Sequence, residues 1–150
     1  MRFGHRPPPA LDLAVTPWGI LGSGILSGKY NADDKTEGRA KIWGLKDRSL
    51  AIAREVRSFA AEVGCTPSQV AIAWLRQQAG VIVPILGART EKQLEENLGA
   101  LRVCLEPSHL ERLHAVTAIE LGFPHEFLAS EQIRQIVMGG THDRIVNHHR

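Results

Sequence analysis

Two short apolar runs, "LAVTPW" at 13–18 and "VIVPIL" at 81–86, constrain the fold more than any other feature of the sequence. Both runs hold β-branched residues and are followed by glycine, a pattern typical of strands that are buried on both faces. The residues between them carry helical patterns, and a strand, a helical crossover and a second strand form the unit that parallel pairing requires. The sequence therefore predicts two short parallel strands, at 13–17 and 81–85, hydrogen-bonded to each other.

The remaining patterned sequence is helical. Apolar residues recur at helical spacing from 48 to 63, namely Ile52, Val56, Phe59 and Val63, and Gly64 ends that stretch. Further helices are predicted where a capping residue or a proline precedes an apolar face, at Thr66, Thr90, Pro107 and Ser130. Two strands and about five helices indicate an α/β chain that is mostly helical, with parallel architecture.

Composition narrows the class of protein. The 150 residues are 43% hydrophobic and 23% charged, which suits one globular core. A formal charge of +2 is too small to indicate binding to nucleic acid or to a membrane surface. The 2 cysteines have no metal-ligand or disulfide spacing, and no long apolar segment resembles a signal peptide or a membrane span. We therefore expect a soluble protein of the cytoplasm, with residues 1–12 as a Pro-rich leader and 31–46 as a long surface loop.

The residues after each predicted strand are the candidate ligand loops, because ligands bind at the carboxyl ends of parallel strands. Gly87 leaves space beside the backbone, and the amides of Ala88, Arg89 and Thr90 lead into a helix whose dipole favours an anion. Arg89 could add a forked cation for a phosphate group. From the pattern alone, an exposed arginine beside an ordinary helix cap is an equally good interpretation.

The loop after the first run is rich in glycine. Its residues 21–24, "LGSG", could present backbone amides to a phosphate, although the loop lacks the spacing of known phosphate-binding motifs. Trp18, at the end of the run, could stack on a planar ligand, but a tryptophan in this position often belongs to the core.

Three stretches, "AVTPWGILGSGILSGKY" at 14–30, "TPSQVAIAWLRQQAGVIVPILGARTEKQLEENLGALRVCLEPSHLERL" at 66–113 and "GFPHEFLASEQIRQIVMGGTHDRI" at 122–145, resemble the carboxyl-terminal part of an aldo-keto reductase, from its seventh strand onward. The resemblance implies that residues 13–150 are a C-terminal fragment of a (β/α)8 barrel of the TIM type that binds NADP(H). It implies stacking of Trp18 on the nicotinamide and contacts of Leu21 and Ser23 with the pyrophosphate. It also implies that the 2′-phosphate and adenine lie against Gly87, Ala88, Arg89, Gln93, Glu96 and Asn97.

The sequence departs from the family in three places. Gly19 and Ile20 replace a usual Ser-Pro, and Gln93 stands where many relatives carry arginine. The family's catalytic Asp, Tyr, Lys and His lie in earlier segments that these residues do not match, so no catalytic residue is predicted here. Tyr30 follows a loop edge and is a poor substitute for the family's tyrosine. No metal site is predicted either, since His142, Asp143, His148 and His149 lie in a polar tail.

Three functions stay open from the sequence. The first is the terminal part of an NADP-dependent aldo-keto reductase, which reduces aldehydes and ketones in the intact family but is inactive alone. Its partner would be the amino-terminal part of the barrel. The second is a noncatalytic dinucleotide-binding or regulatory module. The third is a helix-turn-helix DNA-binding protein, since residues 50–75 predict two helices around a short turn, although the second helix is mostly apolar.

Overall fold

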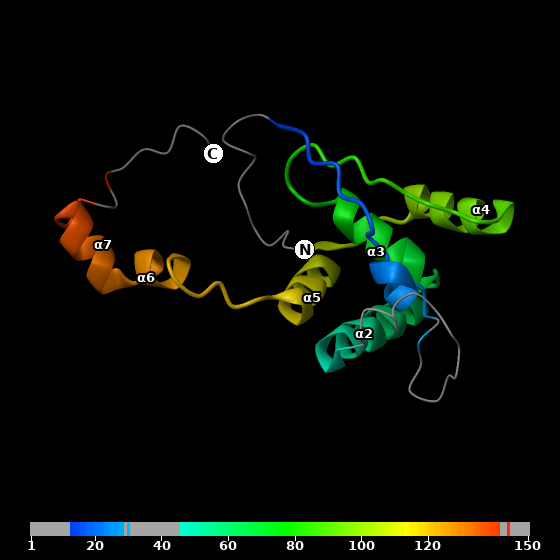
Figure 1. Cartoon of the computed structure of the whole chain (residues 1–150), viewed down its shortest axis with the longest axis horizontal. Coiled ribbons are helices and arrows are strands. Elements are labelled where there is room, and N and C mark those ends of the chain that lie inside the picture. Colours follow the sequence, from blue (N-terminus) through cyan, green and yellow to red (C-terminus); the bar gives the residue numbers. More distant parts are fainter. Residues whose placement is uncertain (1–12, 29, 31–45, 142–143, 145–150) are drawn as a thin grey trace.

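The computed structural model describes residues 13–28, 30, 46–141 and 144, and within these residues the protein is mostly helical. Three helices build the core: α2 (Asp47–Val63), α3 (Pro67–Arg76) and α5 (Pro107–Thr117). The short α4 (Glu91–Gly99) continues into a 3-10 turn, η2 (Ala100–Arg102), and both pack on α3. A second 3-10 turn, η1 (Gly22–Ser27), packs on α2 and α3, and Figure 1 shows α3 at the centre of these elements.

The link between α2 and α3 forms as the sequence predicts. Gly64 adopts a left-handed conformation, with φ 69° and ψ 33°, and its N–H bonds to the carbonyl of Ala60, which ends α2. Thr66 then caps α3, because its hydroxyl accepts from the N–H of Gln69 while the Gln69 side chain accepts from the N–H of Thr66. These caps fix where α2 ends and where α3 begins.

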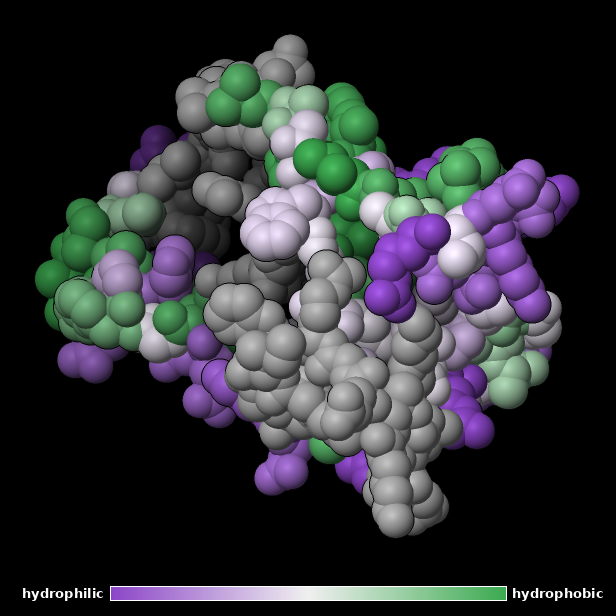
Figure 2. All heavy atoms as spheres, turned by 45° about the vertical axis from the view of Figure 1, so that its right-hand side comes forward, coloured by the Kyte–Doolittle hydropathy of each residue, from purple (hydrophilic) through white to green (hydrophobic). Residues whose placement is uncertain are grey.

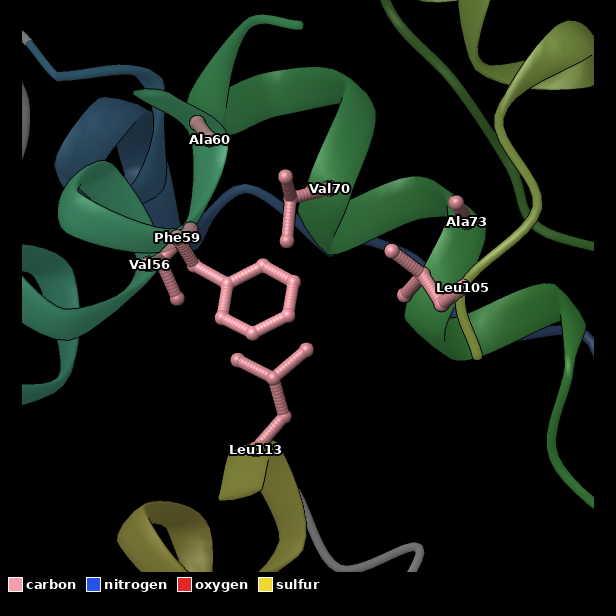
Figure 3. Close-up of a cluster of buried hydrophobic side chains, with 7 residues drawn as sticks. All are labelled: Val56, Phe59, Ala60, Val70, Ala73, Leu105 and Leu113. Carbon is pink, nitrogen blue, oxygen red and sulfur yellow. The ribbon is translucent and has the colours of Figure 1, made fainter. Parts of the chain in front are cut away.

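The core is a cluster of side chains from α2, α3, α5 and the segment before α5 (Figure 3). Phe59 of α2 is 1% exposed and points into the space between Val70 of α3 and Leu113 of α5. Each such side chain contributes about 1.5–3 kcal/mol by leaving water. The edge of the Phe59 ring also meets the His109 ring, with 4.7 Å between centroids, and the Arg112 guanidinium lies 5.0 Å from its centre.

The two predicted strands pair in parallel, but they do not form regular strands. Within the described residues they are joined by one bridge, between Val15 and Ile82. The Val15 N–H donates to the carbonyl of Val81, and the Val83 N–H donates to that of Val15, each at 2.9 Å. Within the described residues the expected partial barrel is therefore reduced to a two-segment ladder, in which each segment has a described neighbour on one side only.

The predicted burial of these segments is wrong. Leu13 is 60% exposed, and Val81, Val83 and Ile85 are 61%, 52% and 54% exposed. The apolar face predicted for α4 is also exposed, at 46% for Leu94 and 47% for Leu98. These side chains have the composition of a core, yet the described residues contain nothing that covers them.

The last part of the chain holds α6 (His125–Ala129) and α7 (Glu131–Met138), which pack against each other. The sequence predicts α7, with its start at Ser130 and its end at Gly139, but not α6. Figure 1 shows both helices extending away from α5. Phe123 is 82% exposed and Ile136 is 69% exposed, and in Figure 2 hydrophobic residues stand at the surface in several separate patches.

The predicted leader at 1–12 and almost all of the predicted loop at 31–46 lie outside the described residues. No helix in the described part has both the length and the hydrophobicity that a membrane-spanning helix needs.

Candidate nucleotide-binding site

The two candidate ligand loops begin at the same end of the paired segments. The Ile85 N–H donates to the carbonyl of Pro17 at 2.9 Å. Trp18 therefore follows directly after the last paired residue of the first segment, and Gly87 comes two residues after that of the second. In parallel architecture this carboxyl end is where ligands bind. The pairing therefore sets the two loops beside one edge, although the loops come from residues about seventy positions apart in the sequence.

The turn into α4 has one hydrogen bond that the sequence does not predict. Thr90 caps α4, and its hydroxyl accepts from the N–H of Gln93 at 3.2 Å. The Gln93 side chain accepts from the N–H of Arg89 at 2.9 Å, one residue earlier than a reciprocal capping box requires. The Arg89 amide is thus not available to a ligand, which corrects one of the three amides predicted at this turn.

Several polar groups at this turn are free to bind an anion. The N–H groups of Ala88 and Thr90 donate to no residue that the structure describes. The exposed Arg89 guanidinium likewise has no hydrogen-bond or ion-pair partner within the described ranges. A Cβ added to Gly87 would meet no atom within 4 Å, so the space beside the backbone is open. These groups surround the amino terminus of α4, whose dipole favours negative charge.

Asn97, two turns into α4, is the second notable polar group. It is only 5% exposed, and its side chain bonds to no other part of the chain that the structure describes. Its side-chain oxygen and nitrogen are not among the described side-chain atoms that are both buried and without a hydrogen-bond partner, so the amide itself reaches solvent. The Asn97 amide is therefore open to a polar ligand, although the residue as a whole is largely buried.

A glutamine on α3 positions α4. The Gln69 side-chain nitrogen donates to the carbonyl of Glu96 at 2.9 Å, and its oxygen accepts from the N–H of Thr66 at the cap of α3. This side chain therefore links the predicted site residues Glu96 and Asn97 to α3. Gly99 lies against the same amide, and a Cβ at Gly99 would stand 2.2 Å from the Gln69 Nε2 atom. The sequence indicates a cap at Gln69 but carries no signal for this contact, since the two helices are far apart along the chain.

The glycine-rich loop after Trp18 forms the other half of the site. Leu21 has φ −91° and ψ 10°, whereas Gly22 has a left-handed φ of 57°. This change from a negative to a positive φ turns successive backbone N–H groups toward the same side. The N–H groups of Leu21 and Ser23 have no acceptor in the described part of the chain. Ser23 itself has φ 57°, a left-handed conformation that is strained for a residue with a side chain. This turn can bind an anion through its backbone.

Trp18 is 72% exposed, so it does not belong to the core. Its indole is available for stacking on a planar ligand. The loop that follows packs on α2 and α3, whereas α4 packs on α3 and η2. The predicted residues thus fall into two groups, one around Trp18, Leu21 and Ser23 and one around the start of α4.

An apolar cavity of about 350 Å³ lies between η1, α2, α3 and α5, and it touches neither Arg89 nor Asn97. Its one cationic lining residue, Arg48, is committed to the carbonyls of Thr117 and Ala118 at the end of α5. The cavity therefore offers no free cationic side chain, and through Gly19, Ile20 and Gly22 it adjoins the glycine-rich loop rather than the start of α4.

The described residues show no replacement for a catalytic tyrosine or a metal centre. Tyr30 is 8% exposed and belongs to the buried part of the protein. No group of three or more potential metal ligands occurs among the described residues, and His142, Asp143, His148 and His149 lie outside them.

The Aldo/keto reductase family matches residues 9–118, and the chain belongs to this family. The family consists of oxidoreductases that use a nicotinamide cofactor. The chain is also similar to a probable aryl-alcohol dehydrogenase of Saccharomyces cerevisiae, AAD4, with 27% identity over 126 residues, which are 79% of this chain and 38% of that protein. A second yeast protein, AAD10, provisionally named as an aryl-alcohol dehydrogenase, is 27% identical over 126 residues and is covered over 44% of its length.

A third protein of the same yeast, also provisionally named as an aryl-alcohol dehydrogenase, is shorter. It is 26% identical over 126 residues, which make up 79% of this chain and 83% of that protein. The chain thus spans less than half of the two longer relatives and most of the shorter one.

Proposed function

We propose that residues 13–150 form the C-terminal, nucleotide-holding part of an NADP-dependent aldo/keto reductase barrel. The observation that carries the proposal is the start of α4, where the Arg89 guanidinium has no partner among the described residues and the space beside Gly87 is open. The Asn97 amide, which also bonds to no described residue, lies two turns further along α4. A phosphate needs the Arg89 guanidinium and the open space at Gly87, and an adenine ring fits the Asn97 amide. All three belong to the same cofactor end in the resembled family.

The residues of this chain would bind and orient the cofactor. Arg89 and the start of α4 would hold the 2′-phosphate, and Asn97 and Glu96 would face the adenine. The turn at Leu21 and Ser23 would accept the pyrophosphate through backbone N–H groups, and Trp18 would stack on the nicotinamide. The bound cofactor supplies a hydride, and the names of the yeast relatives suggest aryl aldehydes and alcohols as the substrate class of the whole enzyme.

Affinity for adenosine phosphates tests the site. Arg89 is expected to make the chain prefer 2′,5′-ADP over 5′-AMP, because only the first ligand carries the 2′-phosphate. Loss of a charge-assisted hydrogen bond costs about 1.5–3 kcal/mol, so Arg89→Ala should weaken 2′,5′-ADP binding by roughly 10- to 150-fold in calorimetry. Arg54→Ala, an exposed arginine of α2, is the matched control and should bind like the wild type. Equal binding of the two ligands would exclude the 2′-phosphate site.

We further propose that these 150 residues alone reduce no carbonyl compound. Hydride transfer builds negative charge on the carbonyl oxygen, and a placed proton donor must neutralise it. The described residues place no such donor at the site, since Tyr30 is buried. Measurement of NADPH oxidation with aryl aldehydes and quinones should show no turnover by the purified chain. Turnover that is absent from a Tyr30→Phe variant would overturn this proposal.

A noncatalytic dinucleotide-binding module uses the same residues, and the same titration supports it. The DNA-binding alternative is disfavoured by the burial of α3, the helix that would have to enter the major groove. Its residues Val70, Ala71, Ile72, Ala73 and Leu75 are all buried. A recognition helix must instead expose polar side chains to bases and phosphates.

A further inference from the structure

The cavity between η1, α2, α3 and α5 has walls that belong to the core of the protein. Its volume is about 350 Å³, and its lining includes Val56, Val70 and Leu113 of the core cluster in Figure 3. None of these three residues is more than 4% exposed. Well-packed walls hold a cavity open in one shape, and pockets for small molecules have volumes of about 300–1,000 Å³.

The chemistry of the lining favours a neutral molecule. Apart from Arg48, Ser49 and Thr117, the described lining consists of glycine, apolar side chains and the ring of Trp74. Trp74 presents ring carbons to the cavity, because its Nε1 atom is buried. The Arg48 guanidinium donates to the carbonyls of Thr117 and Ala118. A charged ligand would lose its hydration here without gaining a free partner of opposite charge, so the cavity excludes ions.

Ser49 supplies a hydrogen-bonding group to the cavity. It lies in the first turn of α2, and its hydroxyl bonds to no residue that the structure describes. The hydroxyl oxygen remains accessible, since it is not among the buried side-chain atoms that lack a partner. In contrast, the Thr117 hydroxyl already donates to the carbonyl of Leu113 at 2.6 Å. Ser49 can therefore bond one hydroxyl or carbonyl group of a ligand that is otherwise apolar.

The volume sets the size of this ligand. An apolar cavity of about 150 Å³ stays dry and binds benzene. A cavity of about 350 Å³ accordingly accommodates two fused rings. A flat aromatic ligand also gains from the Trp74 ring, because aromatic pairs attract beyond their buried area.

We propose that this cavity binds a neutral aromatic molecule of two fused rings that carries one hydroxyl or carbonyl group, and that Ser49 bonds this group. The site touches neither Arg89 nor Asn97, and through Gly19 and Gly22 it lies beneath the glycine-rich loop. The inference does not depend on the proposed nucleotide site, since it uses different residues.

The experiment titrates the purified full chain with 2-naphthol, which is neutral at pH 7, by isothermal titration calorimetry. We expect saturable binding at one site. The matched ligand is 2-naphthoate, which has the same rings and a negative charge. It should bind at least tenfold more weakly, because the described lining has no free cation to receive it. Absence of saturable 2-naphthol binding, or equal binding of the two compounds, would overturn the inference.

Two variants locate the site. Ala71 of α3 lines the cavity and is 9% exposed, so Ala71→Leu fills part of the space and should weaken 2-naphthol binding at least tenfold. Ala61→Leu, on the exposed side of α2, is its matched control and should bind like the wild type. Ser49→Ala should weaken 2-naphthol binding by about two- to tenfold and leave naphthalene binding unchanged.

Circular dichroism confirms that each variant is folded, and Ser49→Ala decides the matter if Ala71→Leu does not fold. Undiminished 2-naphthol binding by the folded variants would place the ligand elsewhere and refute the inference. Stacking on Trp18, which is 72% exposed, is the rival site. We expect Trp18→Ala to keep its 2-naphthol affinity. Loss of binding in this variant, or displacement of 2-naphthol by 2′,5′-ADP, would assign the ligand to the nucleotide site instead.

Discussion

Substitution of Gly99 by alanine tests how α4 is held on α3. In most helices this change stabilises a protein by about 0.5–1 kcal/mol, because glycine loses more backbone freedom on folding. Here Gly99 has helical angles, φ −54° and ψ −25°, but the added Cβ would lie 2.2 Å from the Gln69 Nε2 atom and 3.2 Å from its Cδ atom. The Gln69 side chain must therefore move.

Its movement would break two hydrogen bonds, one to the carbonyl of Glu96 and one from the N–H of Thr66. Each is worth about 0.5–1.5 kcal/mol, so the loss is about 1–3 kcal/mol. After the propensity gain, Gly99→Ala should destabilise the protein by about 0.5–2 kcal/mol. At roughly 2–4 °C per kcal/mol for a chain of this size, the midpoint of thermal unfolding should fall by several degrees.

Urea unfolding followed by circular dichroism measures this effect, and a double-mutant cycle assigns it. In a Gln69→Ala background the alanine at 99 meets no long side chain, so Gly99→Ala should become stabilising by about 0.5–1 kcal/mol. The reversal of sign is the diagnostic result. If Gly99→Ala stabilises both backgrounds equally, the contact between Gln69 and Gly99 does not position α4 and the reasoning fails.

Three further predictions concern the loop, a surface ion pair and the thiols. Ser23→Gly should raise the free energy of unfolding by about 1 kcal/mol in urea titrations, because it relieves the left-handed φ of 57°; no gain would mean that Ser23 is unstrained. Arg112 hydrogen-bonds Glu62 at 2.7 Å and lowers the pKa of its carboxyl. The ionised group therefore stabilises the fold above the ordinary glutamate pKa of about 4.3 and loses this effect as pH falls through the lowered value. Glu62→Gln should accordingly be less stable than the wild type at pH 7 and equal to it in strong acid, whereas a pH-independent difference would contradict the pair. Burial raises the pKa of the Cys65 thiol, whereas Cys104 is exposed. A thiol reagent at pH 8 should therefore modify Cys104 in a fast phase and Cys65 in a slow phase, and Cys104→Ser should leave only the slow phase.

Local signals in the sequence predicted every described α-helix except α6. The cap at Thr66 and the glycine at 64 set their boundaries through hydrogen bonds between residues at most four positions apart, which a sequence pattern can show. The parallel pairing of the two apolar runs was also predictable, since a helical crossover between them permits little else. The residues of the candidate site followed from the resemblance to a family, because no local rule assigns Asn97 to a ligand.

Tertiary structure alone decided which apolar residues are buried. Val83 and Val70 are both valines in apolar stretches, yet Val83 is 52% exposed and Val70 is 0% exposed. The difference arises because only Val70 has α2 and α5 packed against it. The hydrogen bond from the Arg89 N–H to the Gln93 side chain and the contact of Gln69 with Gly99 depend in the same way on how the backbone places each side chain. A hydrophobic side chain gains free energy by leaving water, but whether it is buried depends on which elements are present to cover it.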